Sequence, residues 1–146
     1  MKISTKGRYG LRVMMELARH YGEGPVPVEK IATNQEISGK YIHLLVKDLR
    51  SAGLVRTIRG PRGGYALTRG PSFITALDVV SALEGNLAPV DCVADQELCS
   101  RSDQCIAREV WCEVASAVDG VLSGLTLEQL SARQSAKREE QLTYVI

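Results

Sequence analysis

The chain has 146 residues, 45% of them apolar and 24% charged, which is enough for one core plus an appendage and excludes two large catalytic domains. No run approaches the roughly 18 apolar residues of a membrane span, and the start MKISTKGRYG lacks the apolar core of a signal peptide, so we expect a cytoplasmic protein. Residues 1–70 carry 13 Lys and Arg against 5 Asp and Glu, whereas residues 71–146 carry 5 against 12. The basic half predicts a polyanionic partner, and the acidic half predicts a sensing or assembly module.

Residues 1–70 are predicted to form a winged helix-turn-helix DNA-binding domain. Apolar residues recur at helical spacing between residues 4 and 21, a short helix follows from Val28, and Ser38 opens a third helix that Gly53 ends. The tight turn before the third helix is typical of a helix-turn-helix, whose third helix enters the major groove of DNA. The side chains expected to face DNA are Lys40, Tyr41, His43, Lys47 and Arg50. For Tyr41, a phosphate contact and packing beneath the wing are equal alternatives.

The stretch LVRTIRGPRGGYALT predicts a β-hairpin, the wing, because residues 54–58 and 65–68 alternate as strands around a glycine-rich turn. This turn contains Arg59 and Arg62. Glycine backbone offers little steric obstruction, so both guanidinium groups can approach a phosphate or a narrow minor groove. We expect DNA contact from both arginines in preference to a merely solvated turn.

Four segments follow this domain. Residues 71–85 predict a connecting helix, and residues 86–104 predict a long loop without periodicity that needs an organiser such as a metal. Residues 105–134 predict a dimerisation helix and a short final helix, and residues 135–146 predict a flexible tail. The dimerisation helix carries apolar residues at intervals of three and four, which suit packing against a second copy: Trp111, Val114, Val118, Val121 and Leu125. The predicted fold class is therefore mainly α with a small β-hairpin wing.

Three cysteines are the strongest chemical signal. Cys92, Cys99 and Cys105 have the spacing Cys-x6-Cys-x5-Cys, close enough to converge on one soft metal centre through their thiolates. Cys112 would lie about 10 Å from Cys105 along a shared helix, so we expect it half-buried beside Trp111 instead. An iron–sulfur cluster is favoured over zinc, whose ligands come more often as closer cysteine pairs. Surface thiols or a regulatory disulfide remain the alternative.

Four stretches of the sequence, MKISTKGRYGLR, EISGKYIHLLVKDLRSAGLV, RGPRGGYALT and CIAREVW, together resemble the IscR-like winged-helix regulators over nearly the whole chain. That superfamily includes the NsrR, RirA and CymR types and consists of homodimeric bacterial transcription factors. In its cluster-binding branches, three cysteines before the dimerisation helix hold a 2Fe-2S or 4Fe-4S cluster. The resemblance gives this role to Cys92, Cys99 and Cys105, and we favour the 2Fe-2S form.

The fourth cluster ligand departs from the family pattern. IscR-type proteins have a histidine three positions after the third cysteine, where this chain has Arg108. NsrR-type relatives have an acidic residue near the N-terminus, where this chain has Arg8. The remaining candidates are Glu109, Asp91, a water or a small thiol.

The sequence contains no Ser-His-Asp order, phosphate loop or dinucleotide fingerprint, so we expect no enzymatic activity. The predicted function is a homodimeric regulator that binds a double-stranded DNA operator, has no membrane partner and senses iron–sulfur cluster status. The resemblance implies repression of genes for iron–sulfur biogenesis or sulfur metabolism. Two alternatives stay open: a thiol or nitric-oxide redox regulator without a stable cluster, and a CymR-type regulator acting with a metabolic enzyme.

Overall fold

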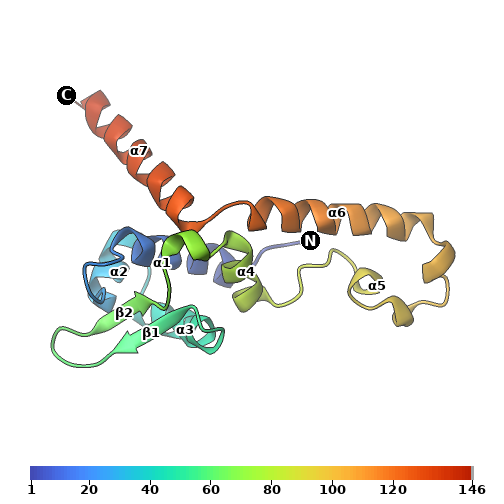
Figure 1. The fold of residues 1–146 in the computed structure, drawn as a ribbon, viewed down its shortest axis with the longest axis horizontal. Helices are drawn as coiled ribbons and strands as arrows, with labels where there is room; N and C mark the ends of the chain where they lie inside the picture. Colours follow the sequence, from blue (N-terminus) through green and yellow to red (C-terminus); the bar gives the residue numbers. More distant parts are fainter. Residues whose placement is uncertain (146) are drawn as a thin grey trace.

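The computed structural model describes residues 1–145. Its N-terminal part consists of α1 (Thr5–Arg19), α2 (Val28–Gln35) and α3 (Gly39–Ser51), followed by the antiparallel strands β1 (Val55–Ile58) and β2 (Gly64–Leu67). Figure 1 shows the hairpin beside α3, at the opposite side of α1 from the C-terminal helix. Both the predicted helix-turn-helix and the predicted wing are therefore present.

One apolar core holds this part of the molecule together. The core residues of α1 and α3 recur every three or four positions, so each helix buries one face. The fully or almost fully buried side chains include Val13, Met14, Leu17, Ile31, Ile42, Leu45, Leu49, Leu54, Val55 and Leu67. Val26 exchanges two backbone hydrogen bonds with Tyr65, of 2.8 and 2.9 Å, which fastens the hairpin to the segment between α1 and α2.

The connecting helix is α4 (Ala76–Glu84), preceded by a short 3₁₀ turn at Pro71–Phe73. It begins with a capping box, in which the Asp78 N–H donates to the Thr75 hydroxyl and the Thr75 N–H donates to the Asp78 carboxylate. α4 packs so closely on α1 that a methyl group at Gly10 would lie 1.9 Å from Leu83 Cδ1. We call α1 to α4 with the hairpin the head.

The segment predicted as a long loop, residues 86–104, contains three short helical turns: α5 (Asp91–Ala94), η2 (Gln96–Leu98) and η3 (Ser102–Gln104). The sequence predicted a loop here and did not predict these short turns. Local polar contacts stabilise these turns, such as the Asp95 carboxylate that accepts a hydrogen bond from the Glu97 N–H. Because turns held by polar contacts need no buried apolar face, they produce no periodic pattern of apolar residues in the sequence.

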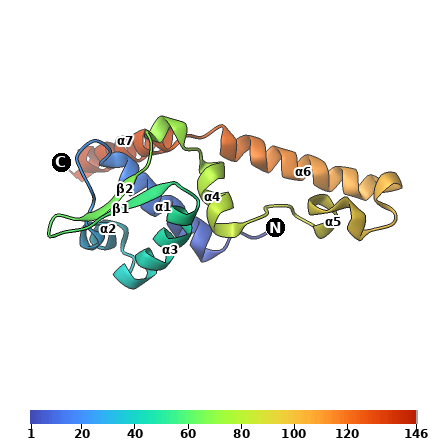
Figure 2. The ribbon, with the colours of Figure 1, turned by 60° about the horizontal axis from the view of Figure 1, so that its bottom comes forward.

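The long helix α6 (Ile106–Ser123) extends away from the head. α5 lies beside the half of α6 that is farther from the head (Figure 2). None of the residues of α6 is buried. Of the predicted dimerisation residues, Trp111 is 42% and Val121 64% exposed, whereas Val114 and Val118 are half-buried. Across residues 1–145, no helix is both long and apolar enough to span a membrane.

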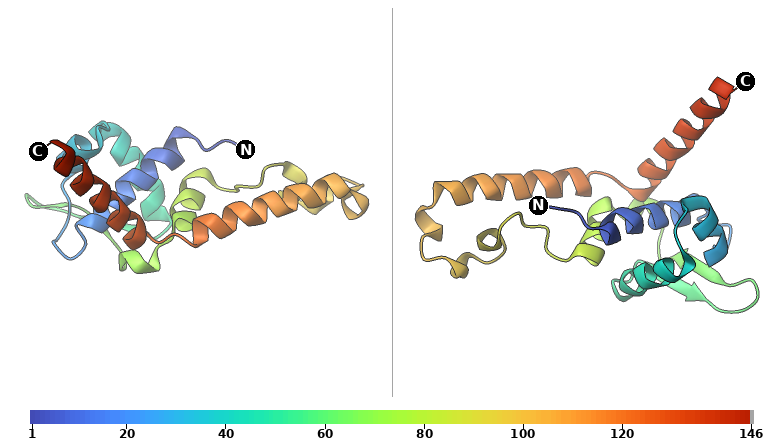
Figure 3. Two further views of the ribbon diagram at one scale, coloured as in Figure 1. Left: turned by 90° about the horizontal axis from the view of Figure 1, so that it is seen from above. Right: turned by 180° about the vertical axis from the view of Figure 1, so that it is seen from behind.

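The C-terminal helix α7 runs from Leu127 to Val145, so the prediction of a short final helix is wrong: the helix continues through the described part of the predicted tail. The last residue of the predicted tail, 146, lies outside them. Helix-forming Ala, Glu, Gln, Lys and Arg dominate α7, and no Gly or Pro interrupts it. Its first turn is anchored by buried Leu127, whose N–H donates to the Ile74 carbonyl (2.9 Å). The two views of Figure 3 show α7 projecting from the head at an angle to α6.

Candidate DNA interface and cysteine segment

Helix α3 presents the predicted DNA-facing side chains as an exposed row. Ser38 caps the helix by accepting a hydrogen bond from the Tyr41 N–H (3.2 Å). The buried face of α3 fixes the rotation of the helix about its axis. Four of the five predicted side chains are consequently exposed: Lys40, His43, Lys47 and Arg50.

The fifth predicted residue, Tyr41, is half-buried against α1. Its ring meets the Tyr9 ring edge to face, with 6.0 Å between the centroids. The interpretation that places Tyr41 beneath the wing is therefore wrong, because its apolar face is covered by α1. A phosphate contact of Tyr41 stays a prediction.

The tyrosine that packs between the wing and α3 is Tyr65, a buried residue of the wing strand β2 that contacts His43, and sequence reasoning did not find this role. Its hydroxyl lies 2.5 Å from His43 Nδ1, and the two rings are edge to face at 5.8 Å. Burial raises the pKa of Tyr65, so the hydroxyl stays protonated and can donate to His43. This contact holds the His43 ring and leaves Nε2 as its second polar atom.

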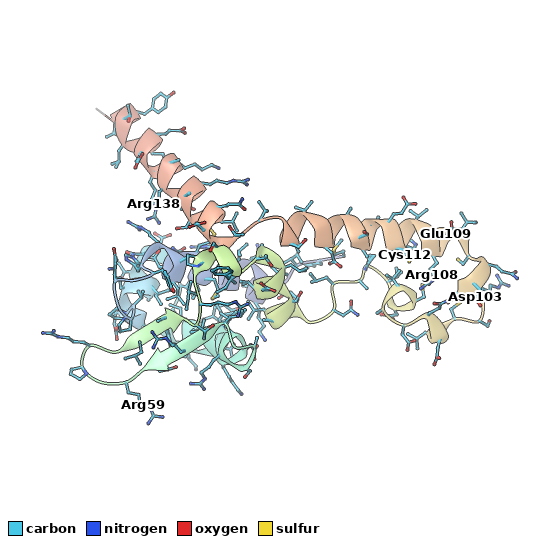
Figure 4. The ribbon with its side chains drawn as sticks, in the orientation of Figure 1. Arg59, Asp103, Arg108, Glu109, Cys112 and Arg138 are labelled. Atoms are coloured by element: carbon cyan, nitrogen blue, oxygen red, sulfur yellow. The ribbon has the colours of Figure 1, made fainter. Side chains whose placement is uncertain are left out.

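The wing turn carries Arg59 and Arg62, both exposed, and Figure 4 shows Arg59 projecting away from the hairpin. The turn depends on glycine: Gly60 has φ +114°, and a methyl group on Gly63 would lie 2.2 Å from the Ile58 carbonyl oxygen. Arg50 of α3 donates to the Thr57 hydroxyl (3.3 Å), so the third helix and β1 are joined directly. We call the exposed basic side chains of α3 and the wing turn the DNA-reading surface, because they are the side chains predicted to contact DNA.

The three predicted metal ligands occupy separate turns of the cysteine segment, residues 91–105. Cys92 lies in α5, Cys99 follows η2, and Cys105 is the N-cap of α6. All are free thiols; Cys99 is exposed, and the other two are half-buried. Cys112 is half-buried on α6, as expected.

The donor chemistry of the three thiols fits an iron–sulfur cluster, but their positions do not. Among residues 1–145, no three His, Cys, Asp or Glu side chains lie close enough together to hold a metal. Glu109 and Asp91, the candidates for a fourth ligand, are both exposed. The structure therefore does not bring the predicted ligands together, and the cluster stays a prediction.

Arg108 stands where IscR-type proteins have a histidine, and its side chain makes a hydrogen bond to the cysteine segment. Its Nε donates to the Cys92 carbonyl oxygen (2.9 Å), which ties α5 to the first turns of α6 (Figure 4). Within the cysteine segment only Ser102 is buried, and its hydroxyl is within hydrogen-bonding distance of the Gln96 and Cys99 carbonyls. Few packing contacts hold the rest of the segment, so its rearrangement would cost little apolar burial.

Known proteins share this architecture. A family model described as an iron-dependent transcriptional regulator, Rrf2, matches residues 3–133. The chain is 43% identical over 145 residues to the HTH-type transcriptional regulator CymR of Bacillus subtilis, which covers 99% of this chain and 100% of the relative. A structure described as CymR, the global cysteine regulator of B. subtilis, is similar with a TM-score of 0.77 and 44% identity, over 91% of this chain and 98% of that one.

A structure of T. potens IscR matches with a TM-score of 0.74 and 36% identity, over 92% of this chain and 88% of that chain. The two structural matches confirm the mainly helical winged-helix fold predicted from the sequence. They also confirm the resemblance to IscR-like and CymR-like regulators. The proteins named here are regulators, which agrees with the expectation of a protein that is not an enzyme.

Proposed function

Because the chain belongs to the Rrf2 family of transcriptional regulators, we propose that it binds operator DNA as a homodimer and uses its cysteine segment to sense iron–sulfur cluster status. The observation that carries the proposal is the combination of an exposed basic surface on α3 and the wing with three free thiols on a thinly packed segment. The basic surface supplies DNA affinity, and the segment supplies soft ligands.

The side chains proposed to contact DNA divide by position. Lys40, His43, Lys47 and Arg50 lie on the outer face of α3, where they would meet base edges and phosphates in the major groove. Arg59 and Arg62 lie on the wing, where they would reach the backbone or the minor groove. Tyr41 stays a candidate phosphate contact at the edge of this surface.

The homodimer is proposed on apolar surface that the single chain leaves uncovered. Trp111 and Val121 are exposed on α6, and a nearly wholly apolar groove runs between the N-terminal residues, α1, α4 and α6. Leu11, Val80 and Val118 are among the residues that line the groove. Two reading surfaces held by one dimer would fit an operator with two half-sites.

The proposed cofactor is an iron–sulfur cluster held by Cys92, Cys99 and Cys105, and the 2Fe-2S form is favoured. When bound, such a group supplies redox and ligand-exchange chemistry that a thiol alone lacks. Since the three thiols do not converge in the structure, the residues between them would have to move for binding. By resemblance, the regulated genes are those of iron–sulfur biogenesis or sulfur metabolism.

The 43% identity to CymR over the whole chain favours a second candidate function, in which DNA binding depends on a metabolic enzyme partner. A thiol or nitric-oxide redox regulator without a cluster is the third candidate, favoured by the exposure of Cys99. Both keep the same DNA-reading surface and differ only in what the rest of the chain senses.

Anaerobic iron, sulfide and absorption analysis of the reconstituted protein separates these functions, with Cys92→Ser as the variant and Cys112→Ser as the matched control. Cluster binding predicts stoichiometric iron and sulfide that Cys92→Ser loses and Cys112→Ser keeps. A colourless protein that binds DNA would refute the cluster. Dependence of its DNA affinity on thiol oxidation would then support the redox function, and dependence on an added enzyme would support the CymR-type function.

A further inference from the structure

A small cavity lined by several charged and polar side chains lies where α7 meets α1 and α2, away from both the DNA-reading surface and the cysteine segment. Its volume is about 120 Å³, which is below the size of a typical pocket for a cofactor or drug-sized ligand. Three arginines contribute to its wall: Arg12 and Arg19 from α1, and Arg138 from α7. Figure 4 shows Arg138 on α7, above the head. The remaining lining residues are Met15, Glu16, Gln35, Ser131 and Gln134.

No carboxylate within residues 1–145 forms an ion pair with any of these three arginines. Arg12 donates from Nε to the Gln35 side-chain oxygen (3.3 Å) and from its terminal nitrogen to the Gln35 carbonyl, both neutral acceptors. Its guanidinium also stacks 5.1 Å from the centroid of the Tyr9 ring, which limits its mobility. The three arginines therefore have no ion-pair partner among the described residues, and the contacts of Arg12 hold its guanidinium in place.

The one carboxylate that lines the cavity, Glu16, is already committed to other partners. It is 2% exposed, and it accepts hydrogen bonds from Asn34 Nδ2 (2.6 Å) and Gln35 Nε2 (2.7 Å). His20 Nε2 lies 3.2 Å from the same carboxylate. Burial acts to raise the pKa of Glu16, but these hydrogen bonds outweigh it and lower the pKa below 4.5. The cavity thus counts three cations against one satisfied anion.

We propose that this cavity binds a small doubly charged oxyanion of the phosphate or sulfate class. Guanidinium groups donate paired hydrogen bonds that match the oxygens of such an anion. The excess of two positive charges matches a dianion, and Ser131 and Gln134 add polar groups from α7. The site is independent of the proposed cluster, since none of its residues belongs to the cysteine segment.

The position of the site gives the anion a structural consequence. Arg138 belongs to α7, Arg12 and Arg19 belong to α1, and Gln35 ends α2 of the helix-turn-helix. An anion bridging these helices would fasten α7 to the head. It would not be a backbone phosphate of the bound operator, because α7 lies on the side of α1 opposite α3 and the hairpin (Figures 1 and 3).

Isothermal titration of the full chain with inorganic phosphate tests the site, at constant ionic strength set by chloride. We expect saturable binding by the wild type and about tenfold weaker binding by Arg138→Gln, because one charge-assisted hydrogen-bond donor is lost. Arg19→Gln tests the α1 wall, and circular dichroism checks that both variants keep their helices. Arg133→Gln, an exposed arginine of α7 outside the cavity, is the matched control and should bind as the wild type does.

Three results would overturn the proposal. The first is no saturable binding of phosphate or sulfate by the wild type. The second is equal weakening by Arg133→Gln and Arg138→Gln, which would show attraction to general positive charge. The third is a fall in affinity for duplex DNA, with a shallower salt dependence, in Arg138→Gln without phosphate, which would make the cavity a contact for the DNA backbone.

Discussion

Glu84 is predicted to stabilise the head by capping α1 from a distance of 80 residues along the chain. Its Oε1 accepts hydrogen bonds from the Ser4 N–H (2.8 Å), the Gly7 N–H (3.1 Å) and the Ser4 hydroxyl. Ser4 occupies the N-cap position of α1, but its hydroxyl does not cap its own helix. Glu84 therefore supplies the acceptor that the first turn of α1 needs.

The change Glu84→Ala removes this acceptor. Loss of the two N–H bonds that cap the helix costs about 1 kcal/mol, and loss of the separate Ser4 hydroxyl bond to the carboxylate adds a similar amount in a half-exposed place. We expect a free energy of unfolding lower by about 2 kcal/mol, which for a chain of this size is a fall in Tm of roughly 4–8 °C. Urea and thermal unfolding at one fixed protein concentration measure both quantities.

The stabilisation by Glu84 should depend on pH. The Ser4 hydroxyl is the main cause that lowers the pKa of Glu84 below 4.5, with the Ser4 and Gly7 N–H groups adding to it. A lowered pKa means that the folded state favours the ionised carboxylate, so the stabilisation is present above the unfolded pKa and is lost as the pH falls through the folded one. The Tm difference between wild type and Glu84→Ala should therefore narrow below about pH 4.

Glu113→Ala on α6 is the matched control, because Glu113 is an exposed helical glutamate and no hydrogen bond or ion pair of its side chain is found in the described structure. The free energy of unfolding of the control should lie within about 0.5 kcal/mol of the wild-type value. A Glu84→Ala variant as stable as this control at neutral pH, or a Tm difference that is constant down to pH 3, would refute the capping role.

Three further changes test the proposed function. Arg59→Ala should weaken duplex binding and lower the salt dependence by about one charge, and an unchanged slope in an electrophoretic or anisotropy titration would remove the wing from the interface. Tyr65→Phe removes the hydroxyl that contacts His43, so we expect the ratio of affinities for a selected operator and for random duplex DNA to fall roughly fivefold. The same ratio in the variant and the wild type would show that the hydroxyl does not orient the ring. Cys99→Ser should lose the cluster and keep the dimer, and a monomer on light scattering would show that the cysteine segment and the dimer interface are not separate.

The head could be predicted because its helices have a strong apolar period. Rotation of α3 is fixed by Ile42, Leu45 and Leu49, so Lys47 and Arg50 had to face outward. The start of α7 was predicted as a short final helix, but its full length was missed, since the residues beyond its first turns form helix by intrinsic propensity and are not buried. A rule based on periodicity detects only helices that cover a core.

The sequence did not indicate which side chains from different elements of the fold contact each other. Tyr41 belongs to the predicted third helix and Tyr65 to a predicted strand of the wing, and nothing in the pattern indicates which of the two packs between the wing and α3. The choice depends on the position of Tyr9 against α3 and on the bridge between Val26 and Tyr65. Both are tertiary contacts, and helical phase does not determine them.

Arg108 shows how a site can be misjudged when each position is tested only for one role. Sequence reasoning treated it as a missing metal ligand, since a guanidinium stays protonated and offers donors but no lone pair to a metal. The same property suits the contact that it makes, a hydrogen bond to the Cys92 carbonyl that fastens α5 to α6. The fastening acts on the backbone of Cys92 and leaves its thiol free. Position 108 therefore joins α5 to α6 whatever the fourth ligand is, so its replacement of histidine does not argue against a sensing role for the three thiols.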